Sequence, residues 1–219
     1  FSPRDDQKYV MPEEIQTRIE NEFEKVYTEV LEANGALLQL SENKLAEKLL
    51  HEQLRNCLEA LLEILTDNDL KVTGCERHVE ANMNLGLPQA FKEDGTAKER
   101  DILGFIDMTL EDKDGHPVVF DFKWTTWSKG YQGLLENNRS IQLELYRWML
   151  SRQEKNGVER VAYFLMPDAR LYSKEEFKGR FCTQIAASND NDIVKQLNNS
   201  ILYRKEQLSS GIVETNGLF

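Results

Sequence analysis

The stretch GFIDMTLEDKDGHPVVFDFKW, from Gly104 to Trp124, decides the fold of this 219-residue chain. Two apolar runs flank the polar segment EDKDGHP, and each run carries one aspartate, Asp107 in the first and Asp121 in the second. Their alternation predicts two strands, at residues 101–110 and 118–124, joined as a hairpin. Two carboxylates inside apolar strands need a physical reason, because burying an unpaired charge is unfavourable.

The turn between the strands sets their pairing. A three-residue loop, Lys113-Asp114-Gly115, would put glycine at the left-handed position that such a loop requires. Asp112 would then pair with His116, and Asp107 would lie directly opposite Asp121 on the same face. A two-residue Asp-Gly turn would instead shift the register by one and send the aspartates to opposite faces. We favour the three-residue loop.

In that register one face of the hairpin is charged and the other is apolar. The charged face holds Asp107, Asp121 and Lys123, with the two carboxylate residues about 5 Å apart at the backbone. A divalent cation balances two carboxylates better than one lysine does, and carboxylate and carbonyl oxygens are the ligands that Mg²⁺ or Mn²⁺ prefers. Whether Glu76 or Glu80 of the preceding strand adds a ligand stays open. The apolar face is expected to be core and comprises Ile106, Met108, Leu110, Val118, Phe120 and Phe122.

The other elements follow from hydrophobic periodicity and from residues that end helices. Helices are predicted at 11–33, 41–65, 140–155 and 190–208, and further strands at 72–83 and 158–166. Residues 86–99 and 128–139 are predicted to be polar connections. A hairpin followed by a helix and another strand predicts an α/β fold with a mixed sheet.

Composition narrows the class of protein. A net charge of −11 disfavours bulk electrostatic binding to nucleic acid, so any such contact must be local or metal-assisted. No apolar run is long enough to span a membrane, and no export signal is visible, so we expect a cytoplasmic protein. Cys57, Cys75 and Cys182 are scattered and cannot supply the four ligands of an iron–sulfur cluster, so none is predicted. The chain begins without methionine, which suggests a fragment of a longer protein.

Four short motifs, taken in order, resemble those of the PD-(D/E)xK nuclease superfamily, and in particular its RecB-like exonuclease branch. They are the histidine of KLLHEQL (His51), GFID (104–107), DFK (121–123) and QLELY (142–146). Gln142 and Tyr146 are four residues apart and therefore share one face of a helix. The resemblance spans close to half of the chain.

The resemblance implies a restriction-endonuclease-like fold, in which helices flank an α-β-β-β-α-β core. It implies Mg²⁺- or Mn²⁺-dependent cleavage of DNA phosphodiester bonds, with exonuclease action in repair or recombination. The metal ligands would be His51, Asp107, Asp121 and the backbone carbonyl of Phe122. Lys123 would be catalytic, and Gln142 and Tyr146 would support the site or bind DNA.

The expected organisation is a single nuclease domain over residues 1–219. It has a helical N-terminal part (11–66), a catalytic core (70–166) and a helical C-terminal part (170–219). DNA is the expected partner, together with a helicase domain or subunit. The alternative is an inactive nuclease fold that binds DNA or serves as a scaffold in a helicase complex. Further candidate contacts to DNA are Trp124 and Trp127 by stacking, and Lys129, Arg139, Arg147 and Arg152 by charge.

Overall fold

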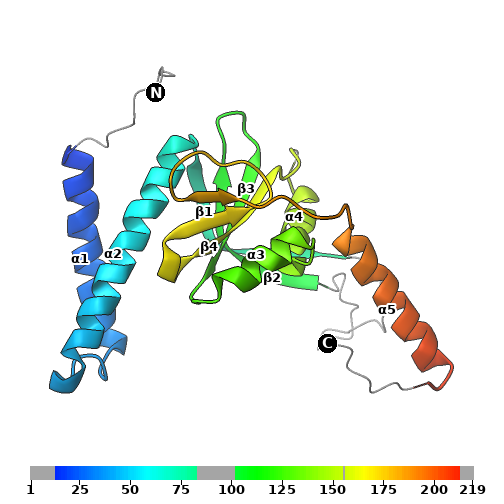
Figure 1. Ribbon diagram of the computed structural model, residues 1–219, viewed down its shortest axis with the longest axis horizontal. Coiled ribbons are helices and arrows are strands. Elements are labelled where there is room, and N and C mark those ends of the chain that lie inside the picture. The colour runs from blue at the N-terminus through cyan, green and yellow to red at the C-terminus, as the bar shows by residue number, and fades with distance from the viewer. Residues whose placement is uncertain (1–12, 83–101, 155, 213–219) are drawn as a thin grey trace, which may run out of the picture.

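The structure is a computed structural model that describes residues 13–82, 102–154 and 156–212 (Figure 1). Its α-helices are α1 (Glu13–Asn34), α2 (Lys44–Asp67), α3 (Ser128–Glu136), α4 (Ile141–Ser151) and α5 (Ile193–Ser209), with short 3-10 helices η1 (Ser41–Asn43) and η2 (Met166–Asp168). Its strands are β1 (Lys71–Ala81), β2 (Ile102–Glu111), β3 (Pro117–Lys123), β4 (Arg160–Leu165), β5 (Arg170–Ser173) and β6 (Cys182–Gln184). The fold is mixed α/β, and the succession α2, β1, β2, β3, α4, β4 is the expected core.

The six strands form one mixed sheet in the order β1-β2-β3-β4-β5-β6. Neighbouring strands from β1 to β3 are antiparallel, whereas β3 and β4 are parallel. A parallel pair requires a crossover connection, which α3 and α4 supply here. The carboxyl ends of β3 and β4 therefore lie side by side, and Lys123 pairs with Leu165.

The β2–β3 turn is the three-residue loop that the sequence predicts. Gly115 has a φ of 81°, in the left-handed region that favours glycine. The N–H of Asp112 donates to the carbonyl of His116 at 3.0 Å. The ladder runs from Glu111 opposite Pro117 to Met108 opposite Phe120, which is the predicted register.

The predicted apolar face of the hairpin is wrong for one residue, Ile106. Met108 and Leu110 are buried in the cluster beneath α2, as expected, but Ile106 is buried in the other cluster, beneath α4. Strand β2 changes face at Asp107. On β1, Glu76 would lie opposite Asp107 and has a φ of 49°, in the left-handed region, so irregular positions coincide on the two strands, although the β1–β2 register is the same on both sides of them.

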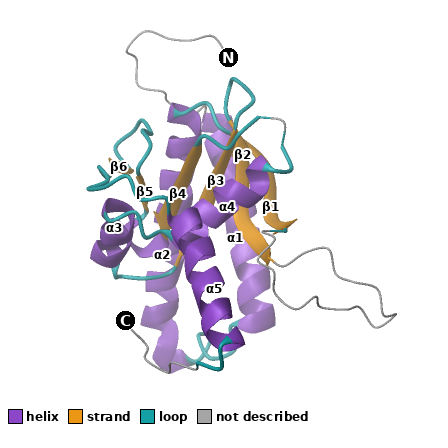
Figure 2. Cartoon of the chain, turned by 90° about the vertical axis from the view of Figure 1, so that its right-hand side faces the viewer, coloured by secondary structure: helices purple, strands orange, loops and turns teal. Residues whose placement is uncertain are grey.

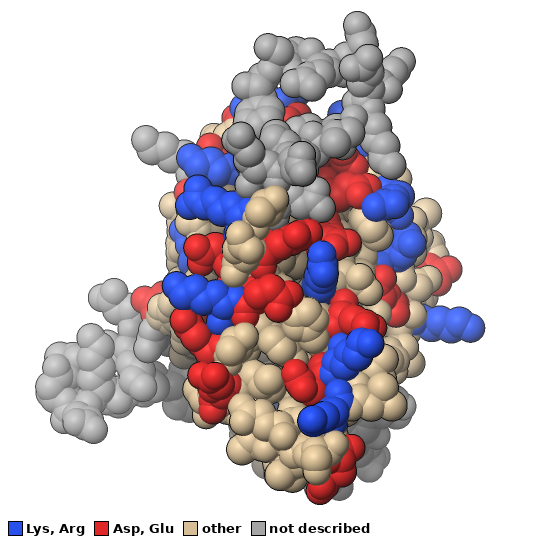
Figure 3. Space-filling model, turned by 90° about the vertical axis from the view of Figure 1, so that its left-hand side faces the viewer, with Lys and Arg blue, Asp and Glu red and all other residues tan. Residues whose placement is uncertain are grey.

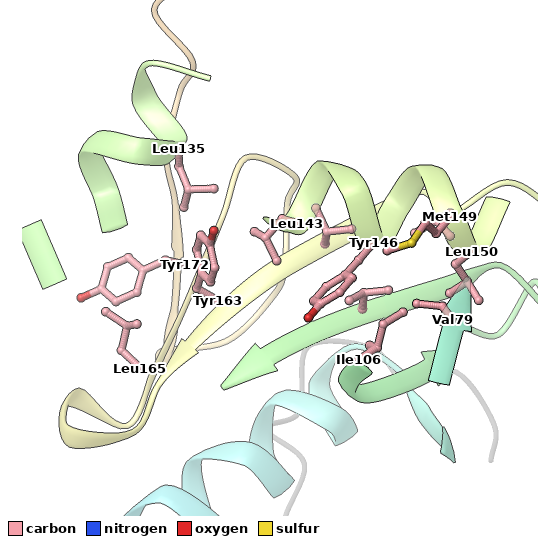
Figure 4. Close-up of a cluster of buried hydrophobic side chains, with 13 residues drawn as sticks. Val79, Ile106, Leu135, Leu143, Tyr146, Met149, Leu150, Tyr163, Leu165 and Tyr172 are labelled. Atoms are coloured by element: carbon pink, nitrogen blue, oxygen red, sulfur yellow. The ribbon is translucent and has the colours of Figure 1, made fainter. Parts of the chain in front are cut away.

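Helices cover both faces of the sheet. Figure 2 shows α4 in front of the sheet and α2 behind it, and Figure 1 agrees. Figure 4 shows the α4 side, where Tyr146 reaches from the helix toward Ile106 on the sheet. The apolar stripes at three- and four-residue spacing explain this packing. The side chains buried by the two helices are Leu143, Tyr146, Met149 and Leu150 of α4 and Cys57, Ala60 and Ile64 of α2.

Two regions differ from the sequence-based expectation. Residues 128–139, predicted as a polar connection, contain helix α3, which buries Leu135 against the sheet. The C-terminal part begins with two short strands, β5 and β6, before α5. These strands are only four and three residues long, too short for a periodic signal. The loop predicted at 86–99 lies outside the described residues.

No helix in the described part of the chain has the length and apolar character needed to cross a membrane.

Candidate active site

Asp121 lies at the centre of the site. It is completely buried in the middle of the sheet, between β2 and β4. The Lys123 ammonium nitrogen is 2.6 Å from Asp121 Oδ2, yet neither carboxylate oxygen has a well-directed hydrogen-bond donor among the described residues. Burial raises the pKa of Asp121 to about 6, against the attraction of Lys123, and the negative charge of Asp107 raises it further.

Asp107 lies where the β2–β3 ladder ends. The last backbone pair is Met108 with Phe120, so Asp107 and Asp121 are opposed by register without pairing through their backbones. Asp107 Oδ2 instead accepts a hydrogen bond from the Phe122 N–H at 2.6 Å. The Asp107 carboxylate therefore takes the place of a backbone carbonyl as the acceptor for the Phe122 N–H. This hydrogen bond links β2 to β3 next to Asp121.

Helix α4 brings the Gln142–Tyr146 pair to the same place. Gln142 Nε2 donates to the Tyr146 hydroxyl at 3.0 Å. Burial raises the pKa of Tyr146, the Gln142 hydrogen bond lowers it, and the charges of Asp121 and Asp107 raise it further. The Tyr146 hydroxyl is therefore electrostatically coupled to both carboxylates.

The glycine of GFID has a packing role. A Cβ added at Gly104 would lie 2.9 Å from Tyr146 Cε1 and 3.3 Å from Met149 Cε. Only a residue without a side chain lets α4 approach β2 this closely. The sequence shows the glycine but gives no reason for it, because the partner is 42 residues away on a different element.

Tyr163 is a neighbour of the site that sequence reasoning missed. It lies opposite Asp121 in the parallel β3–β4 ladder and is buried. Burial strongly raises its pKa, and the charge of Asp121 is the next cause. Residues 158–166 read as a strand, but a parallel register cannot be read from one sequence, so nothing indicated which residue would face Asp121.

His51 is placed differently from the aspartates. Its Nε2 is 2.9 Å from both carboxylate oxygens of Glu24 on α1, and its ring packs edge-on against Tyr27 with centroids 4.6 Å apart. Among the described residues, the ligand atoms of His51, Asp107 and Asp121 do not form a set in which all lie within 4.8 Å of one another. The structure therefore joins the two aspartates, the lysine and the Gln–Tyr pair, but not the histidine.

The donor set at Asp121 suits a divalent cation. Of the two buried Asp121 oxygens, Oδ1 has no donor among the described residues and Oδ2 contacts only the Lys123 ammonium, and a second carboxylate lies beside them; a hard cation satisfies such groups. A different trio, Asp112, His116 and Glu159, has ligand atoms within 4.8 Å of one another at the opposite end of the hairpin. There the Asp112 carboxylate already accepts hydrogen bonds from Arg160 and from two backbone N–H groups, so its oxygens are satisfied.

The predicted DNA-contacting cations fall into two groups. Arg147 is engaged with Glu144 and Glu175, and Arg152 stacks over the Trp148 ring at 4.5 Å. Lys129 and Arg139, by contrast, are exposed and form no ion pair with a carboxylate of the described residues. Figure 3 shows the α1–α2 side of the molecule, where acidic and basic side chains are interspersed. The described part of that face has no broad basic patch, and the net charge of −11 also argues against an extended basic surface.

Comparison with known proteins bears on this geometry. A family model described as the PD-(D/E)XK nuclease superfamily matches residues 7–217, nearly the whole chain, without specifying a branch. A search of curated proteins finds no match to the sequence. Members of the superfamily are generally nucleases that cleave phosphodiester bonds with divalent metals. The chain belongs to the PD-(D/E)XK nuclease superfamily.

Proposed function

We propose that the protein is a divalent-metal-dependent deoxyribonuclease. The observation that carries the proposal is the buried Asp121 carboxylate, whose Oδ1 has no hydrogen-bond donor among the described residues and whose Oδ2 is contacted by the Lys123 ammonium alone, with Asp107 beside it. A purely structural aspartate in a sheet is normally hydrogen-bonded or exposed. An unsatisfied carboxylate flanked by another acid and a cation is typical of a site built for an ion and a reaction.

Asp107, Asp121 and the backbone carbonyl of Phe122 are the groups we assign to the metal, which we take to be Mg²⁺ or Mn²⁺. When bound, such an ion would polarise the phosphoryl oxygen and lower the pKa of an attacking water. Lys123 keeps its ammonium group 2.6 Å from Asp121, where its charge can stabilise negative charge developing on the phosphate. Gln142 and Tyr146 hold the α4 side of the site by their mutual hydrogen bond.

His51 is assigned as a further metal ligand on the condition that its contact with Glu24 opens. In the structure, His51 Nε2 lies 2.9 Å from both Glu24 carboxylate oxygens, so this nitrogen is not available to a metal ion. Glu24→Gln and His51→Ala separate the possibilities. If His51 binds the ion, His51→Ala weakens Mn²⁺ binding and Glu24→Gln does not. If His51 only joins α1 to α2, neither change alters Mn²⁺ affinity.

We further propose exonuclease action of the RecB-like kind, in DNA repair or recombination, with a helicase domain or subunit as partner and a cytoplasmic location. The support is the order of motifs from His51 to Tyr146. Linear DNA and covalently closed circular DNA distinguish exonuclease from endonuclease action, because only the linear form offers an end.

The decisive experiment measures metal-dependent cleavage of labelled DNA by the purified chain and by Asp121→Asn and Lys123→Ala. Asp114→Asn and Lys113→Ala are matched controls, because both residues lie in the exposed hairpin turn. We expect Mg²⁺- or Mn²⁺-dependent cleavage that is lost in the first pair and kept in the second. Cleavage by Asp121→Asn at the parent rate would refute the mechanism. Absence of cleavage by the parent, with DNA binding retained, would favour an inactive DNA-binding module.

A further inference from the structure

Trp127 is an exposed aromatic residue tied to the face of the sheet that holds Asp121. Its ring meets Tyr131 edge-on with centroids 6.2 Å apart, and Tyr131 meets Tyr163 in the same way at 4.8 Å. Tyr163 lies opposite Asp121 in the β3–β4 ladder. The aromatic series therefore runs from the buried carboxylate to the surface, where Trp127 remains 64% exposed.

The Trp127 ring can occupy its position only because Gly130 has no side chain. A Cβ added there would lie 2.2–2.4 Å from three atoms of the indole. The ring thus lies directly on the backbone of the first turn of α3, at a distance that no other residue permits. Trp124 is exposed as well, and neighbouring exposed apolar side chains, unlike single ones, are typical of a binding surface.

The surroundings of Trp127 indicate what it binds. Trp124, directly after Lys123, is also more than half exposed. Lys129, two residues after Trp127, is an exposed cation without an ion pair among the described residues, in a protein with a net charge of −11; Arg139, a second such cation, follows the other end of α3. Two exposed indole rings followed by an exposed lysine in the first turn of α3 match a single nucleic-acid strand, because stacking supplies affinity that a weakly basic surface cannot.

We infer that the substrate enters as unpaired DNA, with a nucleobase stacked on Trp127 and its neighbour on Trp124, next to the Asp121 carboxylate. Inside duplex DNA each base is stacked between its neighbours and only the end pairs have an open face, whereas every base of an unpaired strand can stack on these rings. The inference deepens the proposed function and rests on it for the role of Asp121. It names single-stranded DNA, or the unpaired end of a duplex, as the substrate class.

The test is binding of fluorescein-labelled oligothymidylate and of a blunt duplex of equal length, followed by anisotropy, in an Asp121→Asn background that leaves the DNA intact. We expect Trp127→Ala to weaken single-strand binding by at least about fivefold, which corresponds to about 1 kcal/mol at 1.4 kcal/mol per tenfold change. Duplex binding should change by less than about twofold. Tyr203→Ala, which removes an aromatic side chain of α5 that is also more than half exposed, is the matched control.

Gly130→Ala is the second variant, because it displaces the Trp127 ring without removing it, and alanine favours a helix over glycine. We expect single-strand affinity to fall while the unfolding temperature is kept. Trp127→Phe should restore most of the affinity, because a phenyl ring also stacks.

Each outcome of this test is informative. Equal affinity of parent, Trp127→Ala and Gly130→Ala for oligothymidylate, or no binding by the parent, overturns the inference. A parent that binds oligothymidylate through Trp127 but does not cleave it supports the inference while refuting the proposed nuclease activity. If the parent cleaves duplex ends and Trp127→Ala cleaves them equally well, the nuclease activity is supported and the inference about Trp127 is refuted.

Discussion

Replacing Asp121 with asparagine should stabilise the metal-free protein while abolishing its activity. Burial raises the pKa of this carboxyl from 3.8 to about 6, so the folded protein holds the proton at a pH where the unfolded chain has lost it. The stability of the metal-free protein therefore falls as the pH rises through this interval, and the deficit persists above it. Asparagine has nearly the same shape and carries no charge at any pH, so it lacks the deficit.

The magnitude follows from the two pKa values. At 1.36 kcal/mol per pKa unit, a rise from 3.8 to about 6 corresponds to about 3 kcal/mol of unfolding free energy above pH 7. At pH 5 the same two values give roughly half of this, because the folded protein is then still mostly protonated at this carboxyl. The attraction of Lys123 is already included, since it opposes the rise in pKa.

Urea unfolding in the presence of a chelator, at pH 5 and at pH 8, measures this difference. Asp114→Asn, in the exposed turn, should leave stability unchanged at both values. Adding Mn²⁺ should stabilise the parent by about 2.7 kcal/mol at a hundredfold excess over Kd and should leave Asp121→Asn nearly unaffected. An Asp121→Asn protein no more stable than the parent at pH 8, or an advantage that does not grow with pH, would refute this account of the buried carboxylate.

Three further changes test the packing around the site and the hairpin turn. Gly104→Ala should lower stability by about 1–3 kcal/mol in chemical denaturation, because the new methyl group overlaps the Tyr146 ring; unchanged stability would contradict the close approach of α4 to β2. Asp112→Ala should lower stability by about 1–3 kcal/mol at pH 7, since two turn N–H groups and Arg160 lose their acceptor. Tyr146→Phe should keep the fold within about 1.5 kcal/mol, as expected for a swap that preserves shape, but slow metal-dependent cleavage in a nuclease assay; equal rates would exclude a role for the hydroxyl.

The Asp112 contribution also has a definite pH dependence. Burial alone would raise the pKa of Asp112, but hydrogen bonds from the N–H groups of His116 and Asp114, with the charge of Arg160, hold it below its usual value. Its stabilisation is therefore present above about pH 4 and is lost as the pH falls through the folded-state pKa. Asp112→Ala and the parent should converge in stability under acid, and a constant difference would contradict this assignment.

The hairpin could be predicted because its determinants are local. Gly115 occupies the one left-handed position of a three-residue loop, and that position fixes the register as far as Met108. The change of face at Asp107 could not be predicted, because it coincides with a left-handed residue on a neighbouring strand, Glu76. Local patterns therefore determined the pairing of β2 with β3 but not the course of β2 beyond it.

The site was only partly predictable for a related reason. Asp121 and Lys123 alternate on one strand, and Gln142 and Tyr146 repeat on one helix, so each pair is visible in the sequence. Their assembly depends on how α4 packs on the sheet. The placement of His51 depends on the pairing of α1 with α2, where Glu24 supplies its partner, and amphipathic helices alone do not specify that pairing.

The hydrogen bond from the Phe122 N–H to Asp107 also bears on which cation the proposed metal site would favour. Oδ2 already accepts that hydrogen bond, so a bidentate contact from Asp107 to an ion would compete with it, whereas a contact through Oδ1 alone would not. Calcium often takes both oxygens of a carboxylate and six to eight ligands in total, whereas magnesium takes one oxygen from each carboxylate in a strict octahedron. Because the β2–β3 ladder ends at Asp107, the Phe122 N–H is bonded to this carboxylate and disfavours bidentate coordination by it. We therefore expect the proposed site to suit the octahedral geometry of magnesium better than that of calcium.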